Sequence, residues 1–453
     1  MRRGRILAAA VVIGVLAAAC GNSGDSKSDD STTTRVTDPG ATNTTADLSL
    51  NVPVDAPGVT DTEIGVAVIT SKTNPIGGKY EQFADGVQLF FDKVNSEGGI
   101  YGRELKIVKE RDDVVGLKNQ DEVRASLAED DAFATFLATL QFTGAGLLDE
   151  AGMPTFTWNI NPEMAGHDNI FGSMGAIDFE GAGHLLPWLA TEEGYSKVGI
   201  LAYGISSSSK LCAAGTRRSY EQYSPDVEVA FFDDTLEFGA DMSAQVAEMK
   251  SKGVEFISTC MDTNQVFKLQ TELDKQGLDA VQYLPNGYDH EFLAANGELF
   301  EGAYVISLYV PWEQEPQSPA TQDYLDWVER QGVTPVELTQ TGWIAARQFY
   351  EGLVQAGPEF SQQGVIDGLN QITDFSADGL IVPIDWTKQH IDPASDPSAA
   401  SQFECATVLK IADGEYVPQY NEPGKPWICF DPDPDAPIPE VPESMSFAPG
   451  GEG

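Results

Sequence analysis

The chain has 453 residues, with 27 Lys and Arg against 70 Asp and Glu, and a formal net charge of −43. This charge excludes nucleic acid as a natural partner, because the protein would repel the phosphate backbone. With 42% hydrophobic residues the chain can bury large cores, and its length predicts two or three domains. Its 4 His and 5 Cys leave little material for a transition-metal site, and we expect no metal and no cofactor.

The first residues have the pattern of an export signal. Arginines precede an apolar run from Ile6 to Ala19, which is too short for a comfortable membrane span. The run ends in a sequence that resembles a bacterial lipobox, Leu16-Ala17-Ala18-Ala19-Cys20, with the Leu one residue earlier than usual. The resemblance implies a signal peptide over residues 1–19 and a lipid on Cys20, the first mature residue. An ordinary signal peptide or a short anchor is the alternative.

Two further segments contain few large apolar residues. Residues 20–60 are rich in Ser, Thr, Asp, Asn, Gly and Pro, which predicts a disordered tether. From Asp431 onward Asp alternates with Pro, which predicts a disordered acidic tail over residues 431–453. Neither segment has enough apolar surface to fold by itself.

The remaining four cysteines fit an exported protein, and they allow three pairings. Sequence proximity favours Cys405–Cys429, which leaves Cys212–Cys260 as the second pair. An oxidising compartment favours two disulfides over the alternative of four buried free thiols.

Short apolar strands alternate with amphipathic helices between residues 60 and 310. The valines that lead four consecutive strands are spaced by 29, 27 and 27 residues: Val198, Val227, Val254 and Val281. This spacing accommodates one strand and one crossover helix, so it predicts parallel sheets covered on both faces. Expected strands are 63–69, 104–109, 132–138, 154–157, 197–202, 227–232, 254–260 and 280–284; expected helices include 80–96 and 265–276.

Ligands of such sheets bind beyond the carboxyl ends of the strands. That rule directs attention to the loops that follow the expected strands. They are rich in Ser, Thr, Asn, Asp and aromatic residues: 70–79, 139–143, 158–161, 203–209, 261–264 and 285–289.

The block Asn95-Ser96-Glu97-Gly98-Gly99-Ile100-Tyr101-Gly102-Arg103 resembles a signature of branched-chain amino acid-type periplasmic binding proteins. The strand that begins at Glu63, the pair Asp112-Asp113 and the run Asn161-Pro162-Glu163 are similar to the same family. These proteins are the substrate-binding components of ABC transporters. They have the type I binding-protein fold, an α/β architecture of two Rossmann-like lobes.

The resemblance implies a clamp whose chain crosses three times between the lobes. We expect the crossings near residues 176–180, 307–312 and 384–389. Lobe 1 would then comprise residues 61–178 and 310–386, and lobe 2 residues 179–309 and 387–430. Ligand binding would close the two lobes about this hinge.

The resemblance also implies ligand-binding residues. In the first lobe the matching positions are Phe142, Thr143, Trp158, Asn159 and Asn161, with the helix start at Gly144 favouring an anion.

In the second lobe the matching positions are Ser207, Met261, Asp262, Tyr288 and Asp289. Either Asp262 or Asp289 is placed to pair with a ligand cation. Both aspartates also fit the alternative role of helix N-cap. Because Trp158 and the Phe142 loop depart from the family pattern, the ligand stays open among amino acids, amides, ureas and apolar molecules.

Catalytic motifs are absent from the sequence. There is no Gly-x-Ser-x-Gly, no Walker loop and no zinc-binding His or Cys pair. We therefore expect a monomeric, non-enzymatic receptor outside the cytoplasm, held at the cell membrane only by its N-terminal lipid, that delivers a small ligand to an ABC-transporter permease. A sensor that uses the same clamp without transport is the alternative.

Overall fold

A computed structural model describes residues 47–74, 77–158, 161–175, 181–391, 404–431, 433 and 435–448. The expected signal peptide, Cys20, Asn159 and the first expected crossing at residues 176–180 lie outside the described residues. Within the described part, no helix combines the length and apolar character needed to cross a membrane.

The first sheet has five parallel strands in the order β2-β1-β3-β4-β5. Its central strands are buried along nearly their whole length, which is typical of a parallel sheet covered on both faces. The strands are β1 (Glu63–Thr70), β2 (Glu104–Asp112), β3 (Ala134–Ala138), β4 (Thr155–Thr157) and β5 (Ile170–Gly172).

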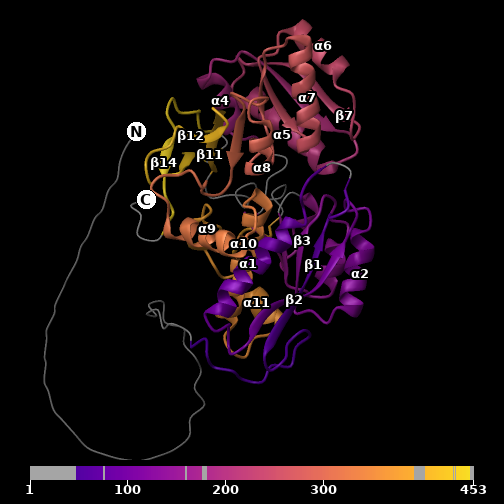
Figure 1. Ribbon diagram of the computed structural model, residues 1–453, viewed down its shortest axis with the longest axis vertical. Coiled ribbons are helices and arrows are strands. Elements are labelled where there is room, and N and C mark those ends of the chain that lie inside the picture. Colours follow the sequence, from indigo (N-terminus) through magenta and orange to yellow (C-terminus); the bar gives the residue numbers. More distant parts are fainter. Residues whose placement is uncertain are drawn as a thin grey trace, which may run out of the picture. The chain divides into compact units, whose positions relative to one another are not determined.

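The helices that pack with this sheet come from two distant parts of the chain. The early set is α1 (Gln82–Ser96), α2 (Asn119–Glu129), α3 (Ala145–Glu150) and η1 (Pro162–Met164). The late set is α9 (Pro319–Gln331), α10 (Glu337–Ala356), α11 (Gln362–Leu369) and η2 (Ala377–Gly379). Figure 1 shows α9 and α10 beside α1, and α11 packs against α10.

Two glycines explain why α1 and α10 pack so closely. A Cβ added at Gly86 would lie 1.9 Å from the carbonyl oxygen of Thr339, and one at Gly342 would lie 2.1 Å from that of Phe83. Only glycine fits at this approach of the two backbones. Residues of the late helices thereby join the hydrophobic core that contains β1 and α1, which is here called the first core.

The second sheet has nine strands in the order β14-β13-β11-β10-β9-β8-β6-β7, and β12 pairs with β11. Strands β6 to β10 are parallel, whereas β11 to β14 join by antiparallel pairing. The strands are β6 (Lys197–Tyr203), β7 (Glu228–Leu236), β8 (Phe256–Cys260), β9 (Val281–Tyr283), β10 (Tyr304–Ser307), β11 (Glu404–Ala412), β12 (Glu415–Gln419), β13 (Trp427–Phe430) and β14 (Glu443–Met445). The helices between them are α4 (Leu185–Glu192), α5 (Ser207–Tyr223), α6 (Ser243–Lys252), α7 (Thr263–Gln276) and α8 (His290–Asn296).

The expected α/β architecture is confirmed, but the second sheet is mixed and not wholly parallel. Short connections in the C-terminal segment, such as the turn between β11 and β12, produce antiparallel neighbours. A parallel neighbour would need a much longer crossover.

Parts of the segments expected as tether and acidic tail pack against the rest of the fold. The Arg103 side chain, 1% exposed, donates hydrogen bonds to the carbonyls of Val52 and Thr60, and Val54 packs against the first core. At the other end β14 pairs with β13, and Phe447 packs against the same core. Composition did not predict these contacts, because they depend on a few apolar side chains that dock onto surfaces supplied by the rest of the fold.

Both expected disulfides are present. Cys405–Cys429 joins the neighbouring strands β11 and β13, with a Cα–Cα distance of 4.1 Å. Cys212–Cys260 joins α5 to the end of β8, with a Cα–Cα distance of 6.1 Å.

The second expected crossing between the lobes, at residues 307–312, lies beside residues 380–381, which precede the third expected crossing. Tyr309 forms an isolated antiparallel bridge with Ile381, and the Val310 N–H donates to the Leu380 carbonyl at 2.9 Å. The division into two lobes at the expected boundaries stays a prediction.

Candidate functional site

Two adjoining cavities lie beyond the carboxyl ends of strands from both sheets. One has a volume of about 300 Å³ and is here called the polar chamber; the other, about 450 Å³, is the apolar chamber. Four residues line both chambers: Tyr80, Trp158, Asp262 and Asn286. Each volume lies in the range of small-molecule sites.

The polar chamber is formed by the loop after β1, the loops after β8 and β9, and the start of α10. Its other lining residues are Gly77, Gly78, Lys79, Gln82, Thr263, Asn264, Tyr288, Asp289, Glu291, Phe292, Val336, Glu337 and Leu338. The loop after β1 closely approaches the start of α7, because a Cβ added at Gly77 would lie 2.3 Å from Nδ2 of Asn264.

An ion-pair cluster spans the polar chamber. Lys79 Nζ lies 3.2 Å from Asp289 Oδ2 and also contacts Glu291. Burial opposes the charge on Lys79, but its contacts with Glu291 and Asp289 outweigh burial and raise the pKa of the ammonium group. Asp289 also caps α8 by accepting hydrogen bonds from the N–H groups of Glu291 and Phe292 at 2.8 and 3.0 Å.

Glu337 is an acid without a counter-charge in the same chamber. It begins α10, and its N–H donates to the Tyr288 carbonyl at 3.3 Å. Among the described residues, none donates a hydrogen bond to its carboxylate or forms an ion pair with it. Burial raises the pKa of Glu337 to about 7.

The apolar chamber is lined mostly by aromatic, aliphatic and sulfur-containing side chains. They are Val115, Leu140, Tyr203, Leu211, Cys212, Phe238, Cys260, Met261, Tyr283 and Pro285, and the wall is completed by Gln141, Gly181, Gly183, Ser206, Ser208, Ser209, Gly215, Thr216 and Ser219. Asp262 is the one charged residue among the described residues that line this chamber.

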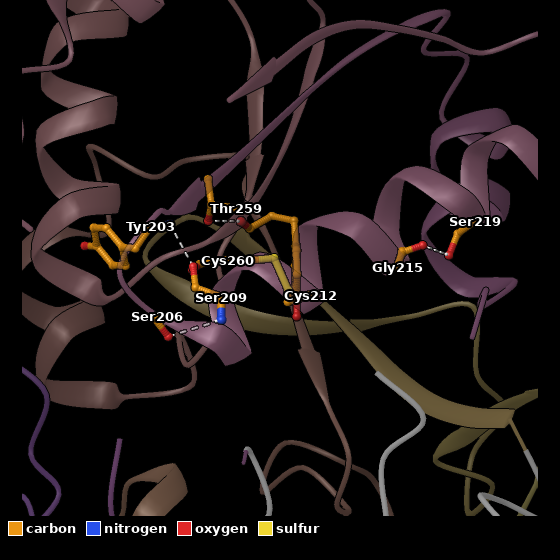
Figure 2. Close-up of a disulfide and its surroundings, with 9 residues drawn as sticks. Tyr203, Ser206, Ser209, Cys212, Gly215, Ser219, Thr259 and Cys260 are labelled. Atoms are coloured by element: carbon orange, nitrogen blue, oxygen red, sulfur yellow. Dashed lines mark hydrogen bonds between the residues drawn. A yellow bond between two sulfur atoms is a disulfide. The ribbon is translucent and has the colours of Figure 1, made fainter. Parts of the chain in front are cut away.

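The second-sheet wall of the apolar chamber is held by a disulfide and a serine (Figure 2). Ser209 Oγ accepts from the Tyr203 N–H at 2.8 Å and donates to the Cys260 carbonyl at 2.5 Å. Ser206 caps α5 by accepting from the Ser209 N–H at 3.2 Å. With the Cys212–Cys260 disulfide, these bonds fix the start of α5 against the ends of β6 and β8.

Asp262 sits where the chambers meet and is already heavily engaged. It caps α7 by accepting from the N–H groups of Asn264 and Gln265 at 2.9 and 3.2 Å, and the Tyr203 hydroxyl donates to its other oxygen. Burial raises the pKa of Asp262, against these hydrogen bonds. Its N-cap role is therefore present, as the alternative interpretation of the sequence had it.

Trp158 and Tyr80 form the aromatic part of the shared wall. Their ring centroids lie 5.6 Å apart at an interplanar angle of 41°, and the two residues are 2% and 4% exposed. Trp158 is fixed at the end of β4 by a 2.9 Å hydrogen bond from its N–H to the Leu137 carbonyl.

The structure brings half of the expected ligand-binding residues together at these chambers. They are Trp158, Met261, Asp262, Tyr288 and Asp289.

Four other expected residues lie outside the chamber walls. Phe142 is 1% exposed and packs in a separate core cluster with Val123 and Leu137. The Asn161 amide donates to the Thr139 carbonyl at 2.9 Å, which gives it a structural role. Thr143 and Ser207 are exposed and line neither chamber.

Four residues of the chamber walls were not predicted from the sequence: Lys79, Tyr80, Asn286 and Glu337. The first three lie in or next to loops that follow expected strands, so the loop rule was available to find them. Glu337 had no such signal, because it comes from a helix far along the chain that packs with the first sheet only in the folded protein.

Nothing in the described part of the chain points to a metal. It contains no group of three His, Cys, Asp or Glu residues arranged to hold an ion. The chambers therefore offer a binding site built from ion pairs, amides, aromatic faces and apolar walls.

A family model described as periplasmic binding protein matches residues 63–403. No curated protein sequence matches the chain. Among solved structures, the chain is similar to the fatty acid ABC transporter substrate-binding protein from Thermomonospora curvata, at 19% identity and a TM-score of 0.66, over 86% of this chain and 98% of that one.

Two further similar structures carry branched-chain amino acids. One is a branched-chain amino acid ABC transporter protein from Thermus thermophilus with bound valine, at 16% identity and a TM-score of 0.64, over 79% of this chain and 95% of that one. The other is LivJ of Streptococcus pneumoniae with isoleucine, at 17% identity and a TM-score of 0.64, over 78% and 98%. These likenesses confirm the type I binding-protein fold, and the chain belongs to the periplasmic binding protein family, which consists of binding proteins and not enzymes.

Proposed function

We propose that this protein is the extracytoplasmic substrate-binding component of an ABC transporter. It captures a small ligand in the two chambers and delivers it to a membrane permease. The observation that carries the proposal is the position of the chambers, which are walled by strand-end loops of both sheets. The solved proteins with the same fold are named as ABC-transporter proteins, which supports the transport role.

Closure of the chambers depends on contacts that cross between the two sheets. Lys79, from the loop after β1, pairs with Asp289 and Glu291 at the start of α8. In a clamp that opens, these ion pairs break, so they favour the closed form. A ligand that contacts both walls adds its binding free energy to the same form and shifts the population toward it.

Five expected residues are proposed to contact the ligand: Trp158, Met261, Asp262, Tyr288 and Asp289. Trp158 has the strongest claim, because it lines both chambers and is held rigidly at the end of β4. Asp289 and Asp262 each accept hydrogen bonds from the N–H groups at a helix start. Their main contribution to ligand binding is therefore negative electrostatic potential, because their carboxylates are already engaged.

Native mass spectrometry of the protein purified from its host tests ligand capture. We expect a small-molecule adduct on the wild type that Trp158→Ala loses. Trp327→Ala is the matched control, because Trp327 lies on α9, is also buried and lines neither chamber. Retention of the adduct in Trp158→Ala contradicts this binding site.

The transport step has its own test. Cells that lack the protein should lose uptake of the captured molecule, and the wild-type gene should restore it where the Trp158→Ala gene does not. Normal uptake without the protein contradicts the transport role.

We also propose that a lipid on Cys20 holds the protein at the outer side of the cell membrane. The support is the lipobox-like run before Cys20. Cys20→Ala should move the protein from the membrane fraction to the soluble fraction after cleavage of residues 1–19. Unchanged membrane retention of a processed Cys20→Ala chain contradicts lipid anchoring.

A further inference from the structure

The two chambers differ in chemistry, and the difference defines a class of ligand. We propose that the ligand is a cationic amphiphile: a primary amine whose ammonium group binds Glu337 in the polar chamber and whose extended apolar body fills the apolar chamber. This proposal rests on the proposed function and names the substrate class of the same site.

Charge in the polar chamber favours a cation over an anion. Four acids line it among the described residues, and Lys79 is the single cation. Lys79 is already shared by Asp289 and Glu291, so its charge is more than neutralised. A ligand carboxylate would meet an uncompensated negative field in a partly buried site, where charges interact more strongly than in water.

The backbone groups that hold carboxylates in other sites are also occupied here. Helix N-termini bind anions through their free N–H groups. At the start of α7 those groups are capped by Asp262, and at the start of α8 by Asp289. The third helix start at the chamber, that of α10, carries Glu337 itself.

Glu337 is the group that lacks a partner. Its carboxylate faces the chamber without a hydrogen-bond donor or an ion pair from the described residues. Burial raises the pKa of Glu337 to about 7, which reports the cost of ionising it in that position. An ammonium ion supplies both the opposite charge and three hydrogen-bond donors.

The apolar chamber accounts for the second half of the ligand. It is the larger chamber, about 450 Å³, and its one charged residue among those described, Asp262, is bound to Tyr203 and to a helix start. No other charged residue among those described there compensates a second ligand charge, so an apolar body fits best. The Tyr80 and Trp158 rings at the junction present π faces, which favour a passing cation and pack against an apolar chain.

An α-amino acid fits this arrangement less well, because its carboxylate would accompany the ammonium group into the acidic chamber. The chamber should therefore prefer a primary amine without a carboxylate over an α-amino acid, although both ligands carry an ammonium group.

Isothermal titration calorimetry on the full chain at pH 8 tests the proposal with three probes of similar size: 4-phenylbutylamine, 4-phenylbutyrate and L-phenylalanine. We expect the amine to bind about tenfold or more tightly than either of the others. Glu337→Gln should weaken amine binding about tenfold or more. The matched control is Glu329→Gln, an exposed acid on α9 away from both chambers, which should leave the affinity unchanged.

Equal binding of the three probes, no binding of the amine at millimolar concentration, or unchanged amine affinity in Glu337→Gln overturns the assignment. Trp158→Phe, a mild change at the shared wall, separates this failure from failure of the site. If Trp158→Phe lowers the affinity for a probe and Glu337→Gln leaves that affinity unchanged, the ligand class is wrong and the proposed site is supported. If neither variant affects any probe, both the ligand class and the proposed site are wrong.

Discussion

Lys79 Nζ lies 3.2 Å from Asp289 Oδ2, and this contact joins the loop after the first strand of one sheet to a helix that follows the ninth strand of the chain. The two residues are 210 positions apart in the sequence. Asp289 also caps α8, so the ion pair connects Lys79 to the start of that helix. The pair therefore couples the two walls of the polar chamber.

Lys79→Met should shift the ligand-free clamp toward its open form. Each exposed ion pair contributes about 0.2–1 kcal/mol, so losing the contacts to Asp289 and Glu291 should lower the ratio of closed to open forms by about threefold to tenfold. Small-angle scattering of the ligand-free protein measures closure.

The matched control for that variant is Lys106→Met. Lys106 also forms a surface ion pair, with Glu63 at 3.1 Å, but both residues belong to adjacent strands of the first sheet. Its loss should leave closure unchanged. Equal effects of the two variants would show that the Lys79 contacts do not contribute to closure.

Glu337→Gln should change how stability depends on pH. The pKa of Glu337 is raised from 4.5 to about 7 in the folded protein, so the folded state holds this proton more tightly than the unfolded state. The free energy of unfolding of the wild type should therefore fall as pH rises from about 4.5 to about 7, by roughly 1–2 kcal/mol for a partly exposed group. Below that window this carboxyl contributes nothing.

The Gln variant lacks this titration, so its melting temperature relative to wild type should be higher at pH 8 than at pH 4.5. Neighbouring groups do not mask the effect. Four tyrosines interact electrostatically with Glu337, and their phenol groups have raised pKa values and stay neutral across this pH range: Tyr80, Tyr283, Tyr309 and Tyr416. The charged groups across the chamber, Lys79, Asp289 and Glu291, are the same in both proteins. A constant difference in melting temperature between pH 4.5 and pH 8 would contradict an elevated pKa at Glu337.

Gly86→Ala should destabilise the protein. The added methyl group would lie 1.9 Å from the Thr339 carbonyl oxygen, so α1 and α10 must move apart. Overpacking of this kind costs about 1–3 kcal/mol. Chemical denaturation measures the free energy of unfolding.

Gly146→Ala is the control for the packing explanation. Gly146 also lies in a helix, α3, but a Cβ there meets nothing within 4 Å. That variant should be neutral or stabilising by about 0.4–1 kcal/mol, because alanine loses less backbone entropy on folding. If both variants were equally destabilised, the close approach of α1 and α10 would not be the cause.

Much of the site followed from local sequence. Trp158, Met261, Asp262, Tyr288 and Asp289 each follow a strand, and parallel strands deliver such residues to one edge of a sheet. Phe142 and Asn161 also follow strands, yet they turn inward to a core cluster and to the Thr139 carbonyl. Chain position places a residue at the edge, but neighbouring side chains decide whether it faces the cavity.

By itself the sequence determined the alternation of strands and helices and the acidic character of the protein, and it favoured both disulfides, Cys405–Cys429 through proximity and Cys212–Cys260 as the pair that remained. These properties depend on periodicity, composition and short separations along the chain. Only the tertiary structure decided that α9, α10 and α11 return to the first sheet, that residues 443–445 add a strand to the second, and that Glu337 reaches the polar chamber. The contact between α1 and α10 joins residues about 250 positions apart, and it forms because their backbones, at Gly86 and Gly342, fit together in the folded chain and leave no trace in local pattern.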